Sequence, residues 1–225
     1  MNVLAFLALP LQLLTGFMVA IVATYLVYNL YRGRRTRALI GTAAVGGWLA
    51  AYVATVVIVS LSSEERVLGF GEPNRFCGFY LDCHAMVMVR AVERTPTLGD
   101  GDRQIRAAGE FYVITVARSS DADRVPIGLA QPEAIVVDAE GRRYRRSTLG
   151  EAALARMVGE QPPLGRAVRT GEAYSTRLVF DLPADVHDPK LHVTERDLLA
   201  RLSELFLIGD EDSLFHRPTL FRLAS

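Results

Sequence analysis

Charged side chains are absent from two long apolar runs at the start of the chain. The runs cover residues 3–30 and 38–61, and the hexapeptide 32–37 between them carries four arginines. Each run exceeds the ~20 apolar residues that a helix needs to cross a bilayer core. Because the connection is so short, we expect residues 1–61 to form an antiparallel hairpin of two transmembrane helices.

The arginines predict the orientation of this hairpin. Short loops rich in arginine stay on the cytoplasmic side of a membrane, so the loop 32–37 is expected to be cytoplasmic. Both termini and the rest of the chain then lie on the outer, extracytoplasmic side of the cell (inner) membrane, which makes the outer part periplasmic or extracellular. A cleaved signal peptide that ends near Ala23 is the alternative, but the chain begins without the basic residues of such peptides.

The composition of the two runs indicates an anchor. Neither run contains Asp, Glu, Lys, Arg or His, whereas transporters and proton relays use ionisable groups within the membrane. The second run is rich in glycine and alanine, which allow two helix backbones to approach closely. Packing against the first run is the simpler interpretation, and a homodimer through Ala43 and Gly47 is the alternative.

Beyond the apolar runs, hydrophobic residues alternate as they do in strands. Strands are predicted over residues 83–92, 111–118, 134–137, 142–145, 174–182, 191–193, 205–208 and 219–223. Thr148 and Glu151 have the spacing of a capping box and predict one short inserted helix that ends at Gly159. Residues 196–203 have a weaker helical pattern. Residues 62–75 lack any apolar period and are expected to be a juxtamembrane linker.

Short strands separated by turns predict a mainly β fold, a β-sandwich, for residues 76–225. Without the loop arginines, 21 basic and 25 acidic side chains remain, and a net charge near −4 argues against nucleic acid as a partner. The sequence contains no nucleophile elbow, zinc-protease helix, phosphate-binding loop or Rossmann glycine pattern. We therefore expect neither an enzyme nor a bound cofactor.

Four segments of this predicted domain carry a family resemblance. Residues 111–116, 134–144, 170–172 and 178–183 resemble membrane-tethered bacterial immunoglobulin-like domains of unknown function. The resemblance covers about residues 76–185 and implies an immunoglobulin-like β-sandwich displayed outside the cell membrane, with no catalytic residues to transfer. The chain departs from the family in lacking a lipobox cysteine and the usual asparagine-containing turn after residue 118.

Both cysteines of the chain, Cys77 and Cys83, lie on the predicted oxidising side of the membrane, where disulfides persist. On a straight strand they would be about 20 Å apart, whereas a disulfide needs Cα atoms within about 7 Å. Residues 78–82 must therefore fold back. We expect a disulfide that holds the first strand and contributes about 2 kcal/mol by the chain-entropy argument.

Copper binding is the alternative for the same segment. Cys77, Cys83, His84, Met86 and Met88 are soft or borderline ligands that suit Cu(I). Strand alternation places the histidine and the two methionines on one face. If the inserted helix or a loop covers that face, the methionines are ordinary core residues.

Other acidic residues and histidines are better explained by turns and surface than by metal binding. Three D-x-D pairs have a spacing that can bind Ca²⁺, but aspartate and glycine are also the residues that turns require. The pairs and the remaining histidines are Asp100/Asp102, Asp121/Asp123, Asp210/Asp212, His187, His192 and His216.

The sequence thus predicts a membrane-anchored, extracytoplasmic, non-enzymatic binding or structural module of the cell envelope. Its partners would be the lipid bilayer and an unidentified envelope or extracellular protein. The alternative is a copper-handling envelope protein that uses residues 77–88.

Overall fold

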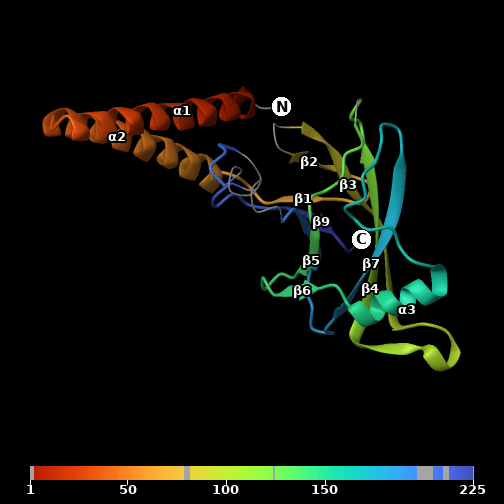
Figure 1. The fold of residues 1–225 in the computed structure, drawn as a ribbon. Helices are drawn as coiled ribbons and strands as arrows, with labels where there is room; N and C mark the ends of the chain where they lie inside the picture. Colours follow the sequence, from red (N-terminus) through yellow and green to blue (C-terminus); the bar gives the residue numbers. More distant parts are fainter. Residues whose placement is uncertain (1–2, 79–81, 124, 197–204, 210–212, 225) are drawn as a thin grey trace. The chain divides into compact units, whose positions relative to one another are not determined.

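The computed structural model describes residues 3–78, 82–123, 125–196, 205–209 and 213–224. The chain divides into two compact units. One comprises Met1–Glu64 with Leu199–Pro218 and contains the two apolar helices, and the other comprises Glu65–Leu198 with Thr219–Ser225 and contains the strands (Figure 1). The second unit therefore begins at Glu65 and not at the predicted residue 76. In addition, residues 199–218 group with the helices and not with the strands.

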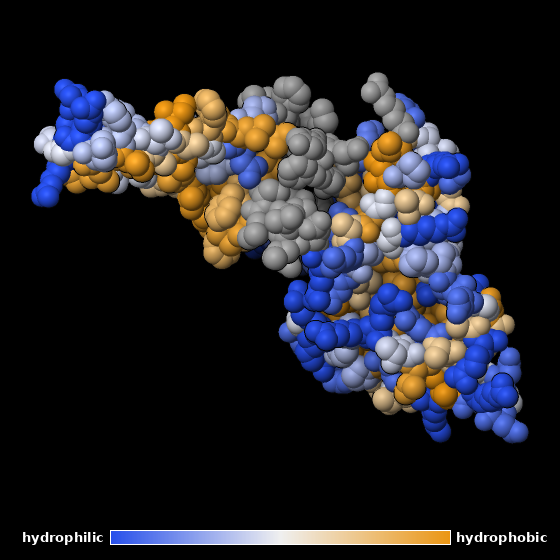
Figure 2. All heavy atoms as spheres, in the orientation of Figure 1, coloured by the Kyte–Doolittle hydropathy of each residue, from blue (hydrophilic) through white to orange (hydrophobic). Residues whose placement is uncertain are grey.

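The first unit is built on helices α1 (Val3–Tyr31) and α2 (Arg35–Leu61), which match the two predicted spans closely. Both are long and apolar enough to cross a membrane. Large apolar side chains lie exposed along them, among them Leu13 at 62% and Phe17 at 66%. Figure 2 shows that hydrophilic residues gather at the end of the helices that carries the arginine loop. The exposed apolar surface of the two helices suits a lipid environment.

Close packing between α1 and α2 involves one of the small residues of the second run. A Cβ added at Gly41 would lie 3.4 Å from the ring of Tyr25, whereas at Gly46 or Gly47 it would meet nothing within 4 Å. Near the middle of the hairpin, the indole nitrogen of Trp48 donates a hydrogen bond to Thr15 Oγ1 (3.1 Å). The homodimer through Ala43 and Gly47 stays a prediction.

The second unit consists of two sheets and one helix. The four-stranded antiparallel sheet has the order β2-β3-β4-β7, and the five-stranded sheet has the order β1-β9-β8-β5-β6. Their strands are β1 (Arg66–Leu68), β2 (Asn74–Gly78), β3 (Asp82–Leu98), β4 (Ile105–Ser120), β5 (Glu133–Val137), β6 (Arg143–Arg145), β7 (Ala173–Leu182), β8 (Lys190–Thr194) and β9 (Thr219–Arg222). The predicted two-sheet sandwich is confirmed at this level.

Several sequence-based expectations need correction. The predicted linker 62–75 contains β1, which pairs in parallel with β9, and the beginning of β2. Residues 205–208 form turns instead of a strand. Because α1 and α2 are long, helix and strand are about equally abundant over the whole chain, and "mainly β" holds only for the second unit. The helix expected at 196–203 falls almost entirely outside the described residues.

The main core lies between the two sheets. Val87 and Val89 of β3, Ile114 of β4 and Phe180 of β7 pack there against residues of the opposite sheet such as Val136, all of them fully buried. The alternation predicted for β3 holds only up to Val89. A bulge at Arg90 shifts the register, so Val92 joins the core instead of Ala91.

Helix α3 (Thr148–Val158) covers the outer face of the four-stranded sheet at one end (Figure 1). Its Ala153 and Leu154 pack on Phe111, Val113 and Val179. The predicted helix is confirmed, but its cap is Ser147 and not Thr148, because the Ser147 side chain accepts a hydrogen bond from Gly150 N. Glu151 pairs instead with Arg146. The close fit also explains Gly150, where an added Cβ would lie 2.5 Å from Val179 Cγ1.

Ser147→Ala should destabilise the second unit, while Thr148→Ala should have little effect. The first change removes the side chain that caps α3, and loss of such a cap costs about 1 kcal/mol. The measurement is urea denaturation of the full chain in detergent, followed by pulse proteolysis of the sandwich. Equal effects of the two substitutions would contradict the observed cap.

Candidate functional site

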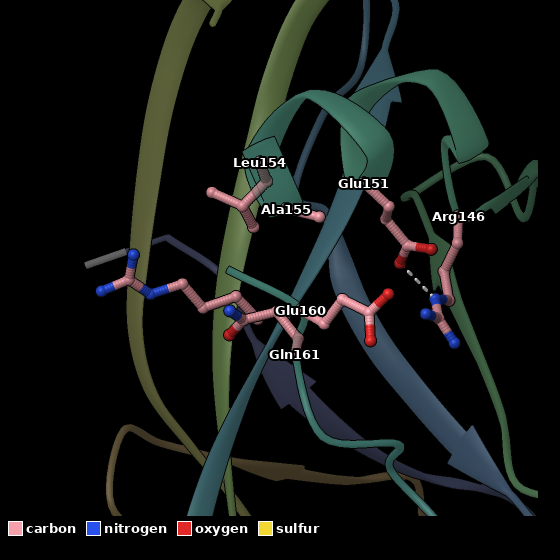
Figure 3. Close-up of a pocket in the computed structure, with 7 residues that line it drawn as sticks. Arg146, Glu151, Leu154, Ala155, Glu160 and Gln161 are labelled. Carbon is pink, nitrogen blue, oxygen red and sulfur yellow. Dashed lines mark hydrogen bonds and ion pairs between the residues drawn. The ribbon is translucent and has the colours of Figure 1, made fainter. Parts of the chain in front are cut away.

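A shallow pocket lies between α3 and the strands beneath it (Figure 3). Its lining combines opposite charges with a small apolar floor and consists of Arg146, Glu151, Leu154, Ala155, Glu160, Gln161 and Arg177. Arg146 and Glu151 point toward one another across its mouth, with Nε 2.5 Å from Oε1. The volume of about 210 Å³ is below the roughly 300 Å³ at which small-molecule pockets begin. These features describe a surface hollow with an ion pair.

The segment predicted to carry chemistry, residues 77–88, lies on β2 and β3. His84, Met86 and Met88 share the outer face of the sheet, as alternation predicted, while their neighbours Ala85 and Val87 are buried in the core. The two methionines are only half-buried, and α3 packs on the other end of the sheet. The expectation that the helix covers this face is therefore wrong.

A charged cluster occupies the end of this face. Asp121 lies just beyond β4, and its Oδ1 is 2.6 Å from His84 Nδ1, while its Oδ2 is 2.8 Å from Arg75 Nη1. The hydrogen bonds from His84 and Arg75 lower the pKa of the Asp121 carboxyl. Both carboxylate oxygens of Asp121 are thus engaged by protein groups, which leaves this D-x-D pair poorly suited to a calcium ion.

The disulfide and copper predictions differ in how the structure bears on them. No described cysteine is free, but the side chain of Cys77 lies outside the described residues, so the Cys77–Cys83 bond stays a prediction. The described residues contain no group of three or more His, Cys, Asp or Glu side chains that could hold a metal. With His84 directed to Asp121, the geometry gives the copper alternative no support.

The remaining candidates lie apart from one another. Asp100 and Asp102 flank the start of a single 3₁₀ turn, η1 (Gly101–Arg103), and Asp210 and Asp212 lie outside the described residues. His187 is exposed in a turn, as expected. His192 is not, because it lies within β8, where burial lowers the pKa of its imidazole. His216 belongs to the first unit, and its Nδ1 is 2.9 Å from the carbonyl oxygen of Arg217.

The best-connected polar group of the second unit is Asp138, which follows β5. Its side chain is fully buried. Oδ1 accepts hydrogen bonds from the backbone N–H groups of Glu140 and Arg142, and Oδ2 accepts from Arg142 Nε (2.6 Å) and Tyr144 Oη (2.9 Å). Arg142 also reaches Asp185 (2.7 Å). This network holds the β5–β6 hairpin, whose Gly141 has a positive φ of 78°.

The Asp138 network was not identified from the sequence. Burial alone would raise the pKa of the Asp138 carboxyl, but the hydrogen bonds from Tyr144 and Arg142, together with the charge of Arg142, lower it overall. A buried aspartate followed four residues later by arginine and six later by tyrosine was the available signal. The saturated carboxylate indicates a structural role.

Arg118 presents the opposite case. It lies on the core-facing side of β4 with no exposed surface, and Nη1 donates to the Met86 carbonyl oxygen (2.9 Å). Its Nε and Nη2 are buried, and no group in the described ranges accepts a hydrogen bond from them. Burial lowers the pKa of this guanidinium, while the neighbouring Tyr174 hydroxyl and Glu195 carboxylate act in the opposite direction. Leaving buried donors unpaired costs free energy.

Comparisons with known proteins add little to this geometry. No protein-family model and no curated protein matches the chain. Among solved structures, the yjhA protein of Bacillus subtilis is 16% identical, with 72% of this chain and 100% of that chain covered and a TM-score of 0.44. The secreted protein MPT63 of Mycobacterium tuberculosis is 14% identical, with 62% and 95% covered and a TM-score of 0.40.

An uncharacterised β-sandwich protein of Clostridium difficile is 9% identical, with 72% of this chain and 97% of that chain covered and a TM-score of 0.36. All three similarities lie at or below 16% identity. With TM-scores of 0.44 or less, they carry no argument about family or function.

Asp138→Asn should lower stability at neutral pH and flatten its dependence on acid. A carboxyl whose pKa is lower in the folded state stabilises the fold above its unfolded pKa of about 3.9, and this contribution is lost as the pH falls through the folded value. The wild type should therefore lose stability progressively below about pH 4. Denaturation midpoints between neutral and acidic pH, with exposed Asp102→Asn as control, measure the difference in slope. Parallel curves would contradict the role of Asp138.

Arg118→Met should stabilise the second unit by about 1–3 kcal/mol, since a buried charge with unpaired donors is replaced by an apolar side chain of similar volume. Arg177→Met provides the control, because that arginine lies half-buried on the neighbouring strand β7. Urea denaturation measures both. A loss of stability in Arg118→Met that exceeds the loss in the control would show that the guanidinium is compensated.

Proposed function

We propose that this protein is a membrane-anchored, non-enzymatic module that holds an immunoglobulin-like β-sandwich on the extracytoplasmic face of the cell membrane. The observation that carries the proposal is the apolar surface of α1 and α2. Exposed leucine and isoleucine side chains lie along both helices, with an exposed phenylalanine on α1. Helix α1 contains no acidic or basic residue between Val3 and Tyr31. Exposure of so many apolar side chains on a 27-residue helix such as α2 is unfavourable in water. The apolar core of a bilayer favours the same surface.

The charge distribution supports the orientation. Arg32 and Arg34 lie in the turn between the helices, and Arg35 and Arg37 lie in the first turn of α2. Arginine in and beside a short loop favours the cytoplasmic side. Every acidic residue of the chain follows α2 in the sequence. The sandwich then lies outside the cell membrane, where it can meet other envelope or extracellular proteins.

The sandwich itself suits a role in binding or support. Asp138 and its partners are engaged in structural hydrogen bonds. The pocket beside α3 is shallow, and two of its lining residues, Arg146 and Glu151, form an ion pair. A protein surface of this kind acts through shape and charge complementarity rather than through a reacting group. We propose an envelope or extracellular protein as the partner.

A membrane-impermeant thiol reagent tests the topology. In intact cells, Leu149→Cys should be labelled, because this side chain is 73% exposed on α3. Thr36→Cys, in the arginine loop, should be labelled only after the membrane is opened with detergent. The unsubstituted chain gives the background from its native cysteines. Labelling of Thr36→Cys alone in intact cells would refute the orientation, and release of the protein from membranes by salt would refute the anchor.

A further inference from the structure

The last turns of α2 have a buried stripe. Tyr52, Val56 and Ser60 recur every four residues and are buried, whereas Ile58 and Leu61 on other sides of the helix are 67% and 64% exposed. The stripe is covered by residues 205–209 and 213–217, which we call the return segment. Although it is far along the sequence, this segment lies beside the end of α2 (Figure 1).

Three hydrogen bonds join the return segment to the end of the hairpin. Tyr52 Oη donates to the carbonyl oxygen of Phe206 (2.8 Å). Ser60 Oγ and Ser213 Oγ form a buried pair at 2.9 Å. Farther out, the backbone N–H of Arg217 donates to Ser63 Oγ (2.9 Å). The contacts therefore extend along α2 from Tyr52 to the residues that follow the helix.

The position of Tyr52 gives the depth of the inner contact. If the apolar layer begins at Ala38, just after the last loop arginine, then its thickness of about 30 Å ends near Ile58 at a rise of about 1.5 Å per residue. Tyr52 then lies about 9 Å below the outer boundary. Side chains tilt toward the N-terminus of their helix, so Tyr52 does not bring Phe206 closer to the water.

Backbone polar groups at such a depth must be satisfied by protein. The return segment meets this condition at two described points. Tyr52 satisfies the Phe206 carbonyl, and the N–H of Leu214 donates to the Leu205 carbonyl oxygen (3.0 Å). These contacts make an irregular segment compatible with an apolar environment.

The side chains of the return segment divide into two groups. Leu207 and Ile208 are 6% and 5% exposed, while Phe206 and Phe215 are 41% and 61% exposed. Phe215 is also held at a positive φ of 67°, which is unfavourable for a bulky residue and persists only where other interactions fix it. Two exposed phenylalanines beside a membrane-spanning helix are the side chains expected at lipid level.

We propose that the return segment dips into the outer leaflet of the bilayer, where Phe206 contacts lipid acyl chains and Phe215 meets their outer boundary. The protein would thus hold the membrane at a third place besides its two helices. The proposal rests on the membrane anchoring proposed above, because the depth of Phe206 is reckoned from α2. The two exposed phenylalanines are assigned to lipid, because the return segment is joined to the part of α2 that lipid surrounds in the proposed arrangement.

Fluorescence quenching by brominated lipids tests this in the full chain, reconstituted in phosphatidylcholine vesicles. Trp48 is the only tryptophan and lies near the expected centre of the bilayer. Phe206→Trp and Phe215→Trp, each in a Trp48→Phe background, report on the return segment, and Leu149→Trp in the same background is the aqueous control. Lipids with bromine high on the acyl chain should quench positions 206 and 215 most strongly, and lipids brominated near the chain end should quench Trp48.

The outcomes separate the two proposals. Quenching of Trp48 together with loss of emission at 206 and 215, but not at 149, supports the dipping segment. Quenching of Trp48 alone, with 206 and 215 quenched by aqueous iodide as strongly as 149, overturns it and leaves the anchor intact. Absence of quenching at Trp48 overturns the anchor itself. Circular dichroism of each variant excludes misfolding as the cause.

Discussion

Burial of β4 on both faces is the constraint from which the second unit is built. Its two alternating sets of side chains are both apolar, so Ile114 and Val116 pack into the space between the sheets while Phe111 and Val113 face the other way. A single sheet cannot bury both sets. The five-stranded sheet covers the first and α3 covers the second, which explains why a helix interrupts a series of strands and why its Gly150 has no room for a side chain.

The two buried charges of this unit show how differently one sandwich can accommodate an ionised group. Asp138 lies beside a turn, where N–H groups and Arg142 are within reach, and every lone pair that burial removes from water finds a donor. Arg118 lies within β4, whose own N–H and C=O groups are used by the sheet. Among the described residues, its Nη1 donates to the Met86 carbonyl oxygen, while Nε and Nη2 have no acceptor within hydrogen-bond distance. Position in the fold, rather than the sign of the charge, decides which group is satisfied.

Sequence patterns predicted those features that depend on local periodicity. The alternation of residues 111–118 and 174–182 gave β4 and β7, and the apolar runs gave α1 and α2. Three features depend on tertiary contacts and were missed: the bulge at Arg90, the choice of Ser147 over Thr148 as cap, and the turns at 205–208. In each case the local sequence permits two arrangements, and packing against a distant element selects one. The partners of Asp138 are local, and only the link from Arg142 to Asp185 is remote in sequence.

The first unit obeys a stricter rule than the second. In water, an irregular segment can leave its carbonyl groups to the solvent, but beside a lipid-facing helix it must find protein donors. In the buried stripe of α2, Val56 contributes only apolar packing. Tyr52 also carries a hydroxyl, which needs a polar partner when it is buried. The Phe206 carbonyl is that group. Under the proposed membrane insertion, the tyrosine on α2 and the apolar return segment, more than 150 residues apart, have a common explanation, because a chain that re-enters lipid needs a protein donor for its carbonyl groups.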